Sequence, residues 1–98
     1  MIPGQVSKVF EGVVVASATS VTLRGGEVFR VTGTTPIQTI NPPLGNRQNQ
    51  CVWLIPTDGA VTLTTGGNIL IGIAMAQNRA TMLTYLNSTQ RWYIENGV

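Results

Sequence analysis

Hydrophobic and polar residues alternate along most of this chain with the period of two that is typical of a half-buried β-strand. The clearest case is the segment 58–76. Residues 61–64 read Val-Thr-Leu-Thr, and isoleucine recurs at every second position from 69 to 73. Between these two runs, Gly66-Gly67-Asn68 tolerates positive φ angles and predicts a turn. The segment is therefore predicted to form a β-hairpin.

The faces of the two strands indicate a register for this hairpin. A three-residue loop at Gly66-Gly67-Asn68 pairs Leu63 with Ile71 and Val61 with Ile73, which keeps one face apolar. A two-residue loop at Gly66-Gly67 would mix the two faces. We therefore expect the three-residue loop.

Further strands are predicted wherever short β-branched or alternating runs lie between Gly, Pro, Asn or Ser turns, at residues 13–16, 21–23, 28–31, 37–40, 51–55, 80–86 and 91–95. Many short strands at a spacing of about 10 residues are typical of an all-β fold. We expect a single domain over residues 1–98, built as a small antiparallel β-sandwich or barrel of jelly-roll type, with no helix longer than two turns.

The apolar run Cys51–Ile55 is predicted to be a strand buried on both faces, because it shows no alternation and ends at Pro56. Cys51 is accordingly expected to be buried and unreactive. The residues expected in the core are Trp53, Leu54, Leu63, Ile71, Ile73 and Leu83.

Charged residues make up 10% of the chain, against about 25% in a typical domain. The six basic residues are scattered and the net charge is only +2, which argues against a nucleic-acid-binding face. No apolar run is long enough to span a membrane, and the start shows no signal-peptide pattern. We expect synthesis in a cytoplasm, and a surface partly covered by neighbouring proteins or simply an uncharged β-domain.

The sequence gives little support to an enzyme. It contains no histidine, and its four acidic residues, Glu11, Glu27, Asp58 and Glu95, are far apart. No metal-ligand spacing and no phosphate-binding glycine loop occurs. We therefore predict no catalytic, metal or cofactor site.

Two segments are candidates for contact with a partner. The first is residues 1–10, either an extended arm or the first strand of the sandwich, with Ile2, Pro3, Val6, Val9 and Phe10 as contact residues. The second is the polar loop 44–50, an exposed contact loop or a plain linker, with contact residues Leu44, Asn46 and Arg47.

From about Val28 onward the chain resembles a small β-module of tailed-bacteriophage virion proteins. The motifs that carry this resemblance are Val-Thr-Gly-Thr-Thr-Pro-Ile-Gln-Thr-Ile at 31–40, an apolar strand at 52–56, Gly-Ala-Val-Thr-Leu-Thr at 59–64, Gly-Asn-Ile at 67–69 and Trp-Tyr at 92–93. Their order and spacing are more specific than any one of them. The first 27 residues lie outside the resemblance.

The resemblance implies a non-enzymatic structural protein of the virion. Because the chain carries little beyond the module, it implies a capsid decoration, or cement, protein on the outer capsid surface. Such a protein binds the major capsid protein and itself, as a homotrimer. The alternatives are a receptor- or glycan-binding tip or fibre module, in which exposed Trp or Tyr stacks on sugars, and a tail or neck adaptor.

Overall fold

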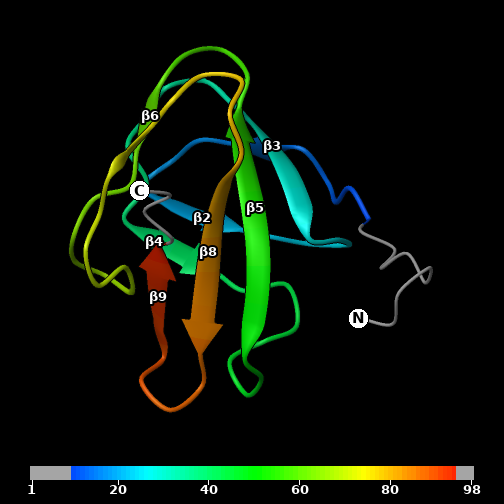
Figure 1. Cartoon of the computed structure of the whole chain (residues 1–98), viewed down its shortest axis with the longest axis vertical. Helices are drawn as coiled ribbons and strands as arrows, with labels where there is room; N and C mark the ends of the chain where they lie inside the picture. The colour runs from blue at the N-terminus through cyan, green and yellow to red at the C-terminus, as the bar shows by residue number, and fades with distance from the viewer. Residues whose placement is uncertain (1–9, 95–98) are drawn as a thin grey trace, which may run out of the picture.

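The computed structural model describes residues 10–94, and every regular element in this range is a β-strand, which confirms the all-β prediction (Figure 1). The prediction of strand boundaries holds to within a few residues for most elements. The strands are β1 (Val15–Ala16), β2 (Ser20–Thr22), β3 (Val28–Thr32), β4 (Thr39–Asn41), β5 (Gln50–Pro56), β6 (Val61–Thr62), β7 (Ala74–Met75), β8 (Thr81–Leu86) and β9 (Arg91–Ile94).

The strands form a five-stranded sheet in the order β1-β3-β5-β8-β9 and two smaller pairs, β2-β4 and β6-β7. Figure 1 shows β2 and β4 behind the larger sheet, so the fold is sandwich-like. Within the described residues the sheets do not close into a barrel. The prediction of an antiparallel fold is wrong for β1-β3, β3-β5 and β2-β4, which pair in parallel. Two strands of the same sheet can pair in parallel because the chain crosses to the other layer before it returns. Between β3 and β5, for example, it forms β4 in the second layer.

The core lies between the layers and is built by alternation. Along β5, Val52 and Leu54 are buried while Cys51, Trp53 and Ile55 face outward. The prediction that this strand is buried on both faces is therefore wrong. The fully buried large side chains are Trp92, Tyr85, Phe29, Leu23, Ile37, Ile40, Leu54, Leu63, Ile69, Met75, Leu83 and Val31.

Three of the residues predicted in the core are there: Leu54, Leu63 and Leu83 are at most 1% exposed. Trp53 and Ile73 are only half-buried, and Ile71 is 69% exposed, so these three predictions are wrong. Ile69 and Ile71 do not share an environment because the chain bends after Ile69 and is not in a strand again until β7. The alternation in the sequence continues where the strand does not.

The hairpin at residues 58–76 exists, but its register differs from the prediction. Val61 pairs with Met75, and the Leu63 N–H donates to the Ile73 carbonyl at 2.7 Å. Leu63 was expected opposite Ile71, so the partner strand is shifted by two residues. A shift by two keeps each side chain on its face, which is why the apolar pattern does not exclude it.

A partly buried polar cluster joins three segments that carry the recognisable motifs. The Asn68 side chain accepts a hydrogen bond from the Ile40 N–H at 2.9 Å and donates to the Ile40 carbonyl at 2.6 Å. The Trp92 indole N–H donates to the same carbonyl at 2.9 Å, and the Trp92 main-chain N–H donates to the Asn68 carbonyl at 2.7 Å. The Gly-Asn-Ile and Trp-Tyr motifs therefore hold the two layers together, which is a structural role.

Candidate interaction groove

A groove of about 450 Å³ lies at one end of the large sheet, beside the start of β5, and it brings together the two predicted contact segments. Phe10 and Leu44 both line it, and they are 58% and 63% exposed. Its lining residues are Phe10, Gly25, Gly26, Glu27, Pro43, Leu44, Asn49, Gln50, Cys51 and Val52. Asn46 and Arg47 are exposed on the same loop but do not line the groove. Ile2, Pro3, Val6 and Val9 lie outside the described residues.

The first wall is the segment 10–12, which is fixed to the start of β3. The Phe10 carbonyl accepts the N–H groups of Glu27 at 2.8 Å and Val28 at 3.2 Å, while the Gly12 N–H donates to the Val28 carbonyl at 2.8 Å. The Glu27 carboxylate accepts the Phe10 N–H at 2.9 Å. Gly26 is required here, because a Cβ would come within 2.4 Å of the Phe10 carbonyl oxygen. These hydrogen bonds fix the position of Phe10 relative to the start of β3.

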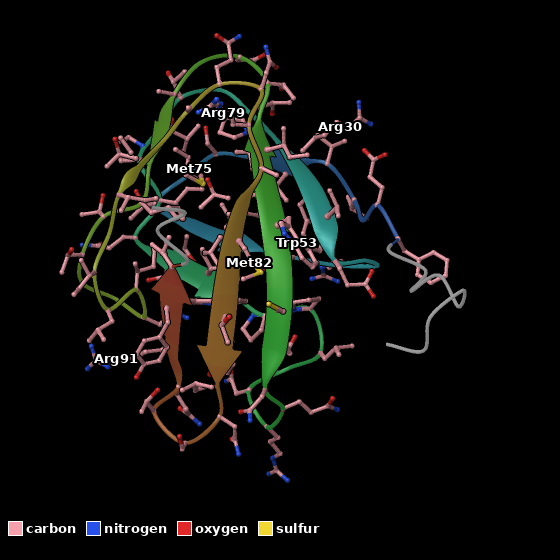
Figure 2. The ribbon with its side chains drawn as sticks, viewed as in Figure 1. Arg30, Trp53, Met75, Arg79, Met82 and Arg91 are labelled. Atoms are coloured by element: carbon pink, nitrogen blue, oxygen red, sulfur yellow. The ribbon has the colours of Figure 1, made fainter. Side chains whose placement is uncertain are left out.

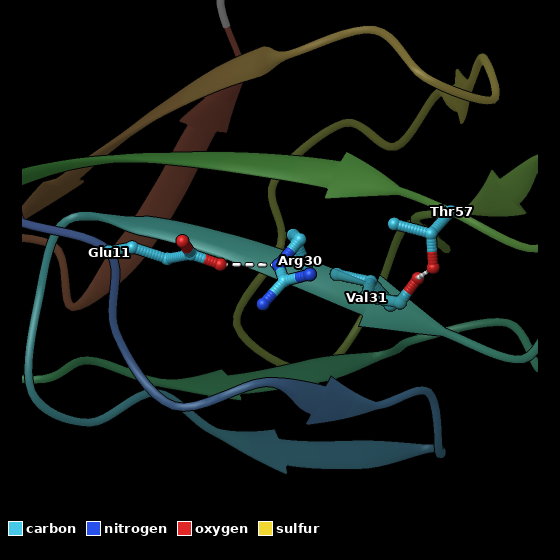
Figure 3. A network of polar contacts seen from close by, with 4 residues as sticks. All are labelled: Glu11, Arg30, Val31 and Thr57. Atoms are coloured by element: carbon cyan, nitrogen blue, oxygen red, sulfur yellow. Dashed lines mark hydrogen bonds and ion pairs between the residues drawn. The ribbon is translucent and has the colours of Figure 1, made fainter.

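An exposed ion pair adds to this attachment. The Arg30 guanidinium on β3 donates to the Glu11 carboxylate (Figure 3). Both side chains are about half exposed, so the pair contributes little stability, on the order of 0–1 kcal/mol. Figure 3 also shows the Thr57 hydroxyl donating to the Val31 carbonyl at 3.2 Å, which ties the end of β5 to the same strand.

The second wall is the loop before β5, and Gln50 shapes it. The Gln50 amide oxygen accepts the Leu44 N–H at 2.9 Å, and its amide nitrogen donates to the Gly45 carbonyl at 2.7 Å and the Gln48 carbonyl at 3.2 Å. Gln50 is only 8% exposed, and a buried amide must find such partners. The loop thus presents Leu44 in a fixed position. The sequence carried no signal for this role, since glutamine at a loop end is common.

The floor of the groove is the first part of β5. Cys51 is exposed there, with its sulfur 3.5 Å from the Thr84 hydroxyl oxygen. The expectation that Cys51 is buried is wrong, because β5 alternates and its odd-numbered residues face outward.

A second candidate surface is the outer face of the large sheet. Val28, Trp53 and Met82 lie opposite one another on three adjacent strands, and Figure 2 shows Trp53 and Met82 side by side. An apolar hollow of about 280 Å³ lies here between Val28, Trp53, Ile55 and Ala80. Trp53 is therefore available to a partner at this surface.

The acidic residues in the described range serve the backbone or an ion pair. Asp58 accepts the Gly33 N–H at 2.7 Å, while Glu27 and Glu11 bind Phe10 and Arg30 as described above. In residues 10–94 no three His, Cys, Asp or Glu side chains gather as they would around a metal ion. No helix in this range is long and apolar enough to cross a membrane.

Comparison with known proteins finds no matching family model, no matching curated protein and no matching solved structure. The resemblance to the virion module therefore rests on the order and spacing of its motifs.

Proposed function

We propose that this protein is a non-enzymatic structural protein of a bacteriophage virion, which decorates the outer capsid surface by binding the major capsid protein. The observation that carries the proposal is the groove, because two segments proposed independently as contact regions, at Phe10 and at Leu44, meet in it. In this proposal the protein also associates with itself as a homotrimer, and it binds neither nucleic acid nor membrane.

The physical character of the surface supports a role in assembly. Solitary domains usually keep about 25–35% of their surface residues charged, whereas this whole chain has 10%. Phe10, Val13, Val14 and Leu44 are large apolar side chains that remain exposed in the single copy. A surface of this kind is suited to coverage by neighbouring subunits.

The test is binding to capsids that lack the protein. Full-length protein should saturate them, and a variant lacking residues 1–8 or carrying Leu44→Asp should bind at least tenfold more weakly. Ile71→Asp is the matched control, because Ile71 is equally exposed but lies away from the groove. Equal binding by all variants would contradict a role for the groove.

Copy number on purified particles decides between a decoration protein and a tip. A stained gel should show this protein at a stoichiometry comparable with the major capsid protein. A few copies per particle would overturn the decoration proposal and favour a tip or an adaptor.

The outer sheet face favours a second candidate, a glycan-binding tip. Half-buried Trp53 beside Met82 offers an aromatic plane on which a sugar ring can stack. In that case Trp53→Ala should abolish the quenching of tryptophan fluorescence by host-surface glycans and leave particle binding unchanged. The absence of any glycan response in the unaltered protein would exclude this candidate.

A further inference from the structure

The groove coincides with a gap in the large sheet. β5 begins at Gln50, but its pairing with β3 begins only at Trp53, which lies opposite Val28. The chain before Val28 turns away at Gly25, which has a φ of +80°, instead of continuing beside β5. Among residues 10–94, no strand occupies the position next to residues 50–52 on the β3 side, and this is where the groove opens.

The backbone of Cys51 is directed into this gap. The Trp53 N–H points toward β3, because it donates to the Glu27 carbonyl at 2.8 Å. Successive residues of a strand direct their N–H and C=O groups to opposite sides, so Cys51 shares the direction of Trp53. On the other side of the strand, Val52 pairs with Leu83 of β8. A main-chain donor and acceptor therefore face the gap that precedes the start of β3.

We propose that this gap receives the N-terminal residues 1–9 of a neighbouring copy as an added strand. The inference rests on the proposed self-association and deepens it by naming the acceptor. In this proposal the groove joins copies of the protein, and the groove variants bind capsids more weakly because they lose the oligomer. An extended segment placed there would bond to Cys51 through its backbone and lie between Phe10 and Leu44. Main-chain pairing supplies affinity in this mode of recognition, and side-chain contacts supply selectivity.

The length and the charge of residues 1–9 fit this role. Nine extended residues reach about 30 Å, and the domain measures 38 × 30 × 28 Å, so the segment can cross from one copy to the next. Its only charged side chain is Lys8, and Glu27 supplies the one charged side chain among the described residues that line the groove. Ile2, Val6 and Val9 offer apolar side chains to Phe10 and Leu44.

The position of Phe10 favours a neighbouring copy over the same copy. Phe10 and Gly12 bond to Val28 on the edge of β3 that faces β1, whereas the gap continues the line of β3 itself. To enter its own gap, the chain would have to move sideways by a full strand spacing, about 4.8 Å, immediately before Phe10. The Phe10 N–H is already fixed by Glu27. The arm of another copy meets no such restriction.

Cys51 allows a direct test, because it lies in the groove and is the one cysteine of the chain. Single cysteines are introduced at four consecutive positions by Gln5→Cys, Val6→Cys, Ser7→Cys and Lys8→Cys, and the purified protein is mildly oxidised. Non-reducing electrophoresis should show disulfide-linked oligomers whose yield rises with protein concentration. The yield should be high at every second position, because only alternate residues of an added strand face the same side as Cys51.

Two controls accompany this series. Moving the acceptor thiol to an exposed site elsewhere, with Cys51→Ser and Thr62→Cys, should abolish the alternation. Leu44→Asp, which alters the exposed groove wall, should lower the yield at every position. Circular dichroism confirms that each variant is folded.

The other outcomes overturn the proposal. Disulfides confined to single chains would place the arm in its own groove, and equal yields at all four positions would indicate random collision. No disulfide at any position would leave the gap to another partner. Because the test uses purified protein, it can fail while binding to capsids succeeds, and the two results remain distinguishable.

Discussion

At the scale of single residues, the partly buried polar cluster around Ile40 shows how a few side chains connect distant parts of the chain. Asn68 bonds to both main-chain groups of Ile40, and Trp92 adds a third bond. Trp92 also packs against Tyr85, with ring centroids 5.1 Å apart. The sequence predicts that Trp92 lies in a strand, but no periodicity indicates that an asparagine in a turn would bind the edge of another layer.

Asn68→Ala should therefore be strongly destabilising. It removes two hydrogen bonds and leaves the Ile40 N–H without its partner, which should lower the free energy of unfolding by about 2–4 kcal/mol. Asn87→Ala is the matched control, since Asn87 is exposed in a turn and should change stability by no more than about 0.5 kcal/mol. Urea denaturation measures both. Equal stability of the two variants would show that the cluster contributes nothing.

Leu63 and Ile71 form a second matched pair, because the sequence predicts the same burial for both and the structure separates them. Leu63→Ala should cost about 2–5 kcal/mol, the range for a large-to-small change in a core. Ile71→Ala should change stability by no more than about 0.5 kcal/mol, because Ile71 is 69% exposed. Thermal unfolding compares them. A large loss in the Ile71 variant would place that side chain in the core.

At the scale of elements, the sequence predicts strands well and their partners poorly. Alternation of Phe29 and Val31 with the polar Arg30 and Thr32 separates the two faces of β3, and both Phe29 and Val31 are fully buried. It does not indicate which strand lies alongside, so the parallel pairing of β3 with β5 was missed. The groove shows the same limit. Phe10 and Leu44 were each predicted as contact residues, but their proximity depends on pairings that the pattern does not contain.

The register of β6 and β7 depends on a close backbone approach at Gly72. A Cβ at Gly72 would come within 1.7 Å of the Leu63 carbonyl oxygen, so no side chain fits without moving the backbone. Gly72→Ala should lower the melting temperature more than Gly59→Ala, where the added Cβ meets only a methyl group of Thr34 at 3.0 Å. Differential scanning fluorimetry is sufficient for the comparison. Equal losses would mean that the two strands can separate at this point without cost.

At the scale of the whole molecule, residues 10–94 of the single copy leave one strand position beside β5 unoccupied and an apolar hollow on the outer face of the sheet, and both are suited to association. The reactivity of Cys51 can be used to detect whether this strand position is occupied, because the thiol is exposed in the single copy. If neighbouring arms fill the gap, association should protect Cys51 by mass action. Labelling of native full-length protein by a thiol reagent should then slow as protein concentration rises.

The variant without residues 1–8 is the control for this measurement. It retains the gap but lacks the segment proposed to fill it, so its labelling rate should not depend on concentration. Labelling at one rate in both proteins at all concentrations would contradict arm exchange. Sedimentation velocity on the same samples should show the full-length protein as an oligomer and the variant as a smaller species.

The indole of Trp92 also has a consequence for how this protein is made. The indole N–H donates a hydrogen bond to the carbonyl of Ile40, 52 residues earlier in the chain, and the Trp92 side chain is fully buried. A ribosome adding about 5–20 residues per second takes roughly 3–10 seconds to travel that distance. During this interval β5 and then β8 are synthesised, while the strand that completes their sheet is still absent. Slow codons between Ile40 and Trp92 should therefore reduce the soluble yield, whereas slow codons before Ile40 should not.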